Sequence, residues 1–465
     1  MAAIAAPTIT ASGTGTVLAP LPVIPTGAGS QANGVAATDT HLYVADGPHD
    51  QILVYSLDGV AQSTIALSAG DYPLDIALSP DKSTLYVADL SSARISKIDL
   101  ASSAATSFAA VAGHDIAVSP DGTVVYLLED GDSQVHAFST VSGSAVATSV
   151  TNGIYQTPSS LAVSPDGATI YASYRDPMGV HTTGGVRLLH ASDLSEITSD
   201  DFQNAGALAV DPTGNVFVGT NDGTSGGGSI QELTSFGVPI GTPLSTGNVP
   251  SVAVVSPDGA TVYVGDDNGS QLYAVDIAAH TVSGALGPVG EAESMAVSPD
   301  GVHLYSSSGT AIPGSVFPFS FLKLTLTAPA SVTPGTGATA FDTQIDDGTS
   351  PVGDHSGDSL LIEIVDATNT VVASGSGAPG ATTGAASIPV NLATLPVGTY
   401  SVRAALTGPD GTIIVTAAGF TIAAAGSAAL AATGVDALLP AGIAVLLLLA
   451  GAITVLARRR VAVRA

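Results

Sequence analysis

The sequence contains no cysteine and no tryptophan, and it has few positively charged residues. The absence of cysteine excludes disulfide bonds and thiolate chemistry, so folding must depend on the burial of apolar surface. Lysine and arginine number 11 against 39 aspartate and glutamate residues, which gives a formal net charge of −28. Nucleic-acid binding needs a basic footprint, so we expect no nucleic-acid partner. An acidic surface of this kind is typical of a protein that must stay soluble.

Long helical periodicity is also missing before residue 435, and a short repeat stands in its place. Its clearest copy, 115–126, has an apolar strand, a Ser-Pro-Asp-Gly turn and a second strand that contains Tyr126. Pro presets φ in such a turn, and Gly accepts a positive φ. Further copies begin at Ser79, Ser164, Ser256 and Ser298. The aromatic residues of the second strands are Tyr43, Tyr86, Tyr126, Tyr171, Phe217, Tyr263 and Tyr305, separated by 40 to 46 residues.

A period near forty residues is long enough for one four-stranded antiparallel sheet. Such a sheet cannot bury both of its faces alone, whereas sheets packed around an axis can. The pattern therefore predicts an all-β fold, with a seven-bladed β-propeller over residues 15–321; a stacked solenoid is the alternative, but nothing resembles a capping repeat. The last unit lacks a fourth strand after Phe321, and we expect residues 16–21 to supply it. Residues 1–14 are expected to be a disordered N-terminus or the remnant of a signal peptide.

Turns of this type before a Tyr-Val strand, as in 79–89 and 256–266, resemble the YVTN-type repeats of surface-layer proteins and the lactonase-like propellers. The resemblance covers about two thirds of the chain. It implies a propeller fold and, for the lactonase-like members, a central metal held by carboxylate and Asn side chains. That metal would polarise a lactone carbonyl for hydrolysis. Propellers serve many unrelated functions, so the resemblance alone does not assign one here.

Candidate site residues stand at the predicted mouth of the propeller, where the chain enters the inner strands. They are Asn33, Asp75, Asp115 and Glu293, with His114 beside them. Oxygen ligands of this kind suit a hard cation, so Ca²⁺ is possible, and no other cofactor is predicted. The alternative is that these acids bind backbone N–H groups at the ends of strands. The aspartates of the Ser-Pro-Asp turns lie on the opposite rim and are expected to form turns.

A second domain is predicted over residues 322–424. About seven short alternating strands indicate an immunoglobulin-like β-sandwich, which would act as a spacer. The stretch Pro396–Val402 resembles the penultimate strand of bacterial immunoglobulin-like surface domains, although no Cys pair or Trp marks an antibody-type domain. Residues 425–434 follow as a small-residue linker with a sorting motif.

The C-terminal stretch has three parts in a fixed order. Leu430, Ala431, Thr433 and Gly434 form a Leu-Ala-x-Thr-Gly motif, the segment 435–457 is apolar enough to span a bilayer, and 458–465 is a basic cytoplasmic tail. This order resembles a Gram-positive cell-wall sorting signal. The resemblance implies that a sortase cleaves between Thr433 and Gly434 and links Thr433 to peptidoglycan. The chain would then be extracellular, and its transmembrane helix would serve only before sorting.

Two functions remain open at this point. The first is a wall-anchored surface protein whose propeller binds or adheres to an unknown protein or glycan. The second is a surface-anchored, metal-dependent hydrolase of the lactonase type. We favour the first, because the sequence has no Gly-x-Ser-x-Gly elbow, no phosphate loop and no recognisable set of catalytic residues.

Overall fold

The computed structural model describes residues 10–150, 157–175, 185–200, 202, 204–222, 226–256, 258–282, 286–309, 314–329, 331–332, 337–346, 357–368, 370–380, 383–408 and 411–422. Over these ranges the chain is all-β, apart from the short 3-10 turn η1 (Gly47–His49). No helix among them has the length and apolar character needed to cross a membrane. The predicted linker and sorting motif (425–434), the hydrophobic helix (435–457) and the basic tail (458–465) lie outside the described residues.

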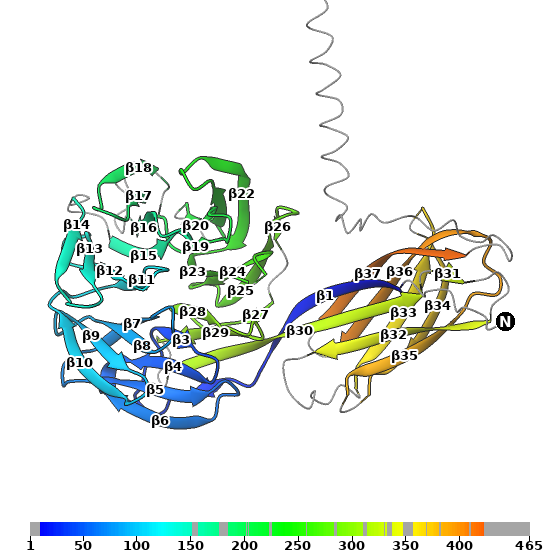
Figure 1. The fold of residues 1–465 in the computed structure, drawn as a ribbon, viewed down its shortest axis with the longest axis horizontal. Coiled ribbons are helices and arrows are strands. Elements are labelled where there is room, and N and C mark those ends of the chain that lie inside the picture. Colours follow the sequence, from blue (N-terminus) through cyan, green and yellow to red (C-terminus); the bar gives the residue numbers. More distant parts are fainter. Residues whose placement is uncertain are drawn as a thin grey trace, which may run out of the picture.

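Repeated four-stranded antiparallel sheets follow one another around a common centre (Figure 1). Their first strands lie toward this centre and their fourth strands lie at the periphery. We call the sheets from β3 through β30 the ring. Its first sheets comprise β3 (Val35–Ala37), β4 (His41–Asp46), β5 (Gln51–Ser56) and β6 (Ala61–Ala66); β7 (Pro73–Leu78), β8 (Thr84–Asp89), β9 (Arg94–Asp99) and β10 (Ala104–Ala109); and β11 (Asp115–Val118), β12 (Val124–Leu128), β13 (Val135–Ser139) and β14 (Ala145–Thr148).

The later sheets of the ring repeat this order with small variations. They comprise β15 (Thr157–Val163), β16 (Thr169–Arg175), β17 (Val186–His190) and β18 (Glu196–Asp200); β19 (Leu208–Val210), β20 (Val216–Asn221), β21 (Gly228–Leu233) and β22 (Pro239–Gly247); and β23 (Pro250–Val255), β24 (Thr261–Asp266), β25 (Gln271–Asp276) and β26 (Thr281–Val282), with β27 (Gly287–Pro288) also paired to β25. The last sheet contains β28 (Ser294–Val297), β29 (His303–Ser308) and the long β30 (Ser315–Pro329).

The N-terminal segment lies beside β30. The strand β1 (Thr10–Pro20) pairs with it antiparallel, from Thr10 opposite Pro329 to Pro20 opposite Phe319. The short β2 (Ile24–Pro25) continues along the same strand, opposite Val316 and Ser315. The segment 16–21, which the sequence places beside the last unit, therefore forms part of this ladder.

The apolar core of the ring lies between neighbouring sheets. Each core cluster combines side chains of two successive sheets, as where Tyr126 of β12 packs with Tyr174 of β16. The last sheet packs on the first in the same way, since Tyr305 and Val316 share a cluster with Leu42. Burial of side chains thus closes the ring. The prediction of an all-β, propeller-like fold is confirmed at this level.

The repeated tyrosine of the second strands adds a polar link between sheets. Tyr126 Oη donates a hydrogen bond to the Ala191 carbonyl of the next sheet at 3.2 Å. Tyr305 Oη donates to the Leu57 carbonyl of the first sheet at 2.8 Å, so the same link spans the closure of the ring. Both aromatic rings are buried, and each therefore contributes apolar area and a satisfied hydroxyl.

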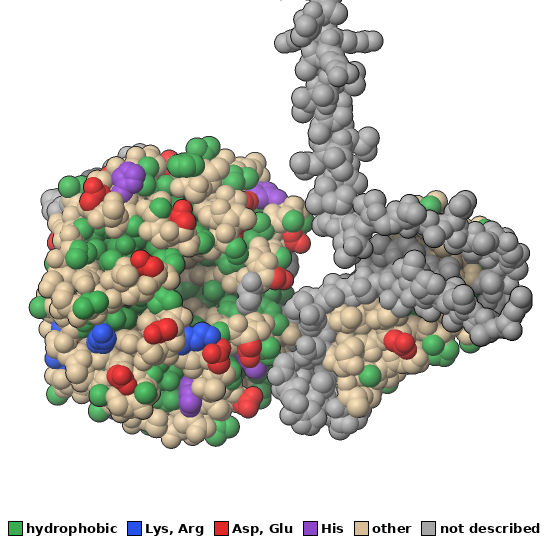
Figure 2. All heavy atoms as spheres, in the orientation of Figure 1, with side chains coloured by type: hydrophobic (Ala, Val, Ile, Leu, Met, Phe, Trp, Pro, Cys, Tyr) green, Lys and Arg blue, Asp and Glu red, His purple; other side chains and the backbone are tan. Residues whose placement is uncertain are grey.

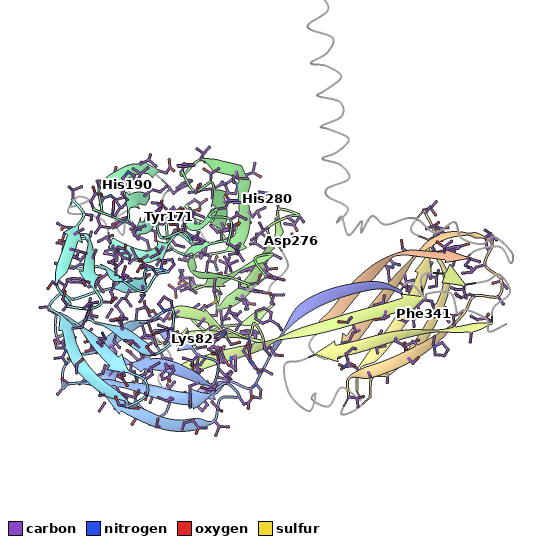
Figure 3. All side chains as sticks on the ribbon, in the orientation of Figure 1. Lys82, Tyr171, His190, Asp276, His280 and Phe341 are labelled. Carbon is purple, nitrogen blue, oxygen red and sulfur yellow. The ribbon has the colours of Figure 1, made fainter. Side chains whose placement is uncertain are left out.

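The Ser-Pro-Asp turns are held by their own side chains. Ser119 Oγ donates to Asp121 Oδ1 at 2.6 Å, and Asp121 Oδ1 accepts the Thr123 backbone N–H at 3.0 Å. Donation by Ser119 and then by Thr123 holds the pKa of Asp121 below its usual value. Lys82, which replaces the turn Gly in one repeat, adopts a φ of 57° and pairs with Asp39 at 2.7 Å (Figure 3). These aspartates form turns, as the sequence predicts.

A second body of two sheets follows the ring. One sheet continues from β30 into β32 (Ala338–Asp346) and β35 (Ala385–Asn391), and the other contains β31 (Ser331–Val332), β37 (Gly411–Ile422), β36 (Gly398–Gly408), β33 (Ser359–Val365) and β34 (Val371–Gly377). Side chains of both sheets form a single apolar cluster, in which Phe341 of β32 and Ile362 of β33 are fully buried (Figure 3).

Two predicted boundaries need correction. Residues 1–14 were expected to be a disordered N-terminus or the remnant of a signal peptide, but residues 10–14 belong to β1 and pair with residues 325–329 of β30. The boundary predicted between residues 321 and 322 falls inside β30. That strand pairs with β29 over its first half and with β32 over its second half. In sequence, the alternating residues after 322 resemble the start of a new domain. In the structure they continue β30, and β1 pairs with β30 on both sides of the predicted boundary.

Gly34 offers a test of the close packing between the first two sheets. A Cβ at this position would lie 2.7 Å from Asp75 Cα and 2.8 Å from the Ile76 backbone nitrogen. Because backbone atoms cannot move aside cheaply, we expect Gly34→Ala to lower the free energy of unfolding by about 1–3 kcal/mol. The matched control is Gly131→Ala in the same ring, where the nearest atom is a flexible Glu129 oxygen at 3.6 Å. Urea unfolding of both variants measures the difference, and equal midpoints would contradict the prediction.

Candidate ligand pocket at the centre of the ring

A cavity of about 250 Å³ lies where the inner strands begin, at the axis of the ring. Residues in or just before β3, β7, β11, β15, β19, β23 and β28 line it, so every inner strand contributes. Its polar lining consists of Asn33, Asp75, His114, Asp115, Ser159, Ser160, Ser251, Glu293 and Ser294. The four candidate residues from the sequence, which are far apart in the chain, therefore border one cavity.

Asp75 and Asp115 join neighbouring inner strands through their carboxylates. Asp75 Oδ2 accepts the backbone N–H of Ile116 at 3.2 Å, and Asp115 Oδ2 accepts that of Leu161 at 2.8 Å. Each acid thus accepts a hydrogen bond from the backbone of the next sheet. The donor is the residue that follows the repeat equivalent of the acid, so Asp75 binds the residue after Asp115. The alternative role that the sequence left open, binding of backbone N–H groups at strand ends, is seen for both acids. Both residues also line the cavity.

The two acids also interact with each other. Burial raises the pKa of Asp75 well above its usual value, and the charge of Asp115 and a hydrogen bond to its carboxyl raise the pKa further. The Ile116 N–H bond opposes this shift without reversing it. Two carboxyls this close oppose ionisation, so Asp75 keeps its proton to a higher pH than an ordinary aspartate does. While it is protonated, Asp75 can donate a hydrogen bond.

His114 stands beside this pair and faces a further acid. Its Nδ1 lies 3.3 Å from Asp130 Oδ1 in the turn after β12. Burial lowers the pKa of His114, but the hydrogen bond and charge of Asp130, together with the charge of Asp115, outweigh burial and raise it. His114 therefore carries a positive charge more readily than an isolated imidazole.

Arg175, at the end of β16, reaches over the start of a neighbouring sheet. A Cβ on Gly206 would lie 2.4 Å from the Pro250 carbonyl oxygen and 2.9 Å from a guanidinium nitrogen of Arg175. The contact with the Pro250 backbone requires a residue without a side chain at position 206. Burial lowers the pKa of Arg175, and Asp267 and Glu293 act against that effect. Burial and then Asp267 raise the pKa of Glu293. These interactions place Arg175 near Asp267 and Glu293, and Glu293 lines the pocket.

Asn33 is buried and occupied by structural bonds. Its Nδ2 donates to the Pro73 carbonyl at 3.0 Å, and its own carbonyl accepts a hydrogen bond from Ser307 Oγ. The pattern predicted Asn33 as a metal ligand together with Asp75, Asp115 and Glu293. The three acids do not bring their oxygen atoms within 4.8 Å of one another, since the one His/Asp/Glu group of three that does so among the described residues lies elsewhere. As arranged, the four residues make a poor Ca²⁺ site.

The acids that follow the second strands serve the fold. Asp46, Asp89 and Asp266 have no exposed surface. Asp266 accepts backbone N–H groups from Asn248 and Val249 at 2.9 and 2.8 Å, which fixes the loop that leads into β23. Burial raises the pKa of Asp89 to about 7, although Ser96 Oγ donates to it. None of these three residues lines the central pocket.

Sequence reasoning missed Arg175 and Asp130. Arg175 follows Tyr174, which stands where most repeats carry an acid, so the break in the pattern was the available signal. Asp130 was hidden in an acidic turn whose neighbours, Glu129 and Asp132, look equivalent to it in sequence. The small side chains Ser159, Ser160 and Ser251 leave the space that the cavity occupies.

The chain matches no protein-family model, and no curated protein is detectably similar to it. Its fold resembles that of a solved structure of hydrazine synthase from Kuenenia stuttgartiensis, with a TM-score of 0.54 and 15% sequence identity. The match covers 62% of this chain and 95% of the hydrazine synthase chain. At this identity the similarity bears on the fold alone.

The raised pKa of Asp75 makes stability depend on pH in a defined direction. An acid whose pKa is raised on folding contributes stability below its unfolded pKa and loses that contribution as pH rises through the folded pKa. We therefore expect Asp75→Asn to become progressively more favourable, relative to the parent protein, as pH rises above the usual pKa of an aspartate. Urea unfolding at a series of pH values above that pKa measures the difference.

The control for this experiment is Asp193→Asn. Hydrogen bonds from Ser195 lower the pKa of Asp193, so its contribution is complete above the unfolded value and should not change over the same range. Parallel curves for the parent protein and Asp75→Asn would show that the pair holds no extra proton.

Proposed function

We propose that this chain is a cell-surface binding protein, covalently anchored to the wall by a sortase. In this proposal the ring is a seven-bladed β-propeller of the YVTN-type and lactonase-like group, and the second body is an immunoglobulin-like spacer. The C-terminal motif Leu430–Gly434 is the sorting signal, and the apolar segment after it holds the precursor in the membrane. The mature protein is then extracellular.

The observation that carries the binding role is the pocket at the axis. Polar groups from or just before every inner strand except β19, which contributes Leu208, converge there, with donors and acceptors on several sides. Its volume of about 250 Å³ suits a group no larger than one sugar ring or one polar side chain. We infer that the ligand is such a group at the end of a glycan or a protein segment. Exposed acidic side chains with few basic ones surround the ring on the face in Figure 2, which disfavours strongly anionic partners.

The alternative is a hydrolase of the lactonase type. One observation favours it, namely that Asp75, whose pKa is raised by burial and by the charge of Asp115, lines the pocket together with Asp115 and His114. Such groups could act as general acid and general base. The metal-dependent form has less support, because the carboxylates of Asp75, Asp115 and Glu293 do not converge.

Filling the pocket separates these roles. Ser159 lines the cavity, and Ser159→Phe should lower binding of the full chain to an array of purified glycans and peptides at least about tenfold. Ser142→Phe, at an exposed position on another part of the ring, is the matched control and should bind as the parent protein does. Hydrolysis of simple lactones that is retained in Ser142→Phe and lost in Asp115→Asn would replace the binding role with the hydrolase.

Anchoring is tested by one substitution in the motif. Expressed in a sortase-bearing Gram-positive host, the parent protein should be released from walls by muramidase with peptidoglycan fragments on Thr433. Thr433→Ala should abolish this covalently linked fraction, because the bond to be cleaved follows Thr433. Ser427→Ala in the linker is the control. Equal wall-linked fractions for both variants would rule out sorting at this motif.

A further inference from the structure

The turn between β12 and β13 carries a second group of ionisable side chains, apart from the central pocket. Glu129, Asp132 and His136 each offer one atom such that all three atoms lie within 4.8 Å of one another. Among the described residues, this is the one group of three His, Asp or Glu side chains with that geometry. Two hydrogen bonds within the turn shape it: Glu129 N–H donates to the Gln134 carbonyl, and Gln134 N–H donates to Asp132 Oδ1, both at 2.9 Å.

The imidazole of His136 is oriented by its other nitrogen. Thr148 Oγ1, on β14, lies 3.2 Å from Nδ1. A proton on Nδ1, donated to Thr148, leaves the Nε2 lone pair facing the carboxylates. This is the arrangement by which second-shell groups fix a metal-binding histidine. The ring is held further by stacking on Phe138, with centroids 6.3 Å apart.

His136 Nε2 is the atom that points to a ligand. It lies 2.7 Å from Glu129 Oε2 and 3.8 Å from Asp132 Oδ1, and the His136 side chain is only 13% exposed. The atom itself is inaccessible to solvent, yet it has no hydrogen bond of acceptable geometry. When the imidazole is protonated, Nε2 forms an ion pair with Glu129. When it is neutral, a cation between the three atoms would take the place of that proton.

We propose that Glu129, Asp132 and His136 bind a divalent transition-metal ion of the Zn²⁺ type. Imidazole nitrogen and carboxylate oxygen are both ligands for Zn²⁺, whereas Ca²⁺ takes oxygen ligands almost alone. The Glu129 and Asp132 side chains are 24% and 39% exposed, so water can complete the coordination from the solvent side. This site does not depend on the function proposed for the central pocket.

The position of the site gives it a structural consequence. Asp130, on the same turn, pairs with His114 at the pocket. A bound metal would therefore hold the turn that carries Asp130, and Asp130 in turn contacts His114 in the lining of the pocket.

The test uses the full chain, stripped of metal with a chelator and titrated with Zn²⁺ by calorimetry. We expect saturable binding of one ion per chain, and Co²⁺ bound at the same site should show visible absorption typical of mixed nitrogen and oxygen ligands. His136→Gln and Asp132→Asn should each weaken Zn²⁺ binding at least tenfold. His190→Gln is the matched control, because His190 is exposed and lies on a different sheet (Figure 3).

Unfolding curves of the variants show whether each one is folded. Asp132→Asn replaces an exposed carboxylate by its isosteric amide, so it should disturb folding less than His136→Gln does. Zn²⁺ binding that is unchanged in both variants, or absent from the parent protein, would overturn the proposal. A Ca²⁺ response equal to that of Zn²⁺ would also overturn it, because imidazole would then play no part.

Discussion

Burial between neighbouring sheets is the constraint on which the rest of the structure depends. A strand such as β8 is buried along almost its whole length, so its sheet has no face that can be left in water. Each sheet therefore needs a neighbouring sheet on both of its faces. In a row of such sheets, the outer faces of the first and last sheets are buried only when these two sheets pack against each other. The contacts of Tyr305 and Val316 with the first sheet meet this need. Since no disulfide can form, side-chain packing and the β-ladders hold the closure.

Closure also creates the pocket. It brings the starts of the inner strands to one axis, where side chains too polar for the core gather around a common space. Asp75 and Asp115 show how such residues serve two purposes, because each binds the backbone of the next sheet and borders the cavity. This arrangement buries Asp75 beside the charge of Asp115, and both effects oppose the ionisation of Asp75.

The sequence allows much of this fold to be predicted, for physical reasons that are local. Ser119 and Asp121 form their turn through bonds that span four residues, so the pattern alone indicates their role. The gathering of Asn33, Asp75, Asp115 and Glu293 follows from the repeat, since all four lie at the start of an inner strand and the inner strands of a ring share the axis. Arg175 could not be placed, because its contacts depend on how far a long side chain extends over Gly206. His136 was missed because its neighbours come from one turn at a spacing that matches no common metal motif. The continuity of β30 was missed because alternation does not reveal which strand accompanies it.

The long strand β30 ties the orientation of two bodies to a single backbone. It pairs with β29 in the ring and with β32 in the second body, and β1 runs beside it through the junction. Successive side chains of a strand point to opposite faces, so one inserted residue at the junction would turn every following side chain over. Buried Leu324 and Leu326 would then face away from their core. Evolution can lengthen an ordinary flexible linker freely, but this connection can change length only with compensation in β1. The length and pairing of β30 thus set the orientation of the ring relative to the second body.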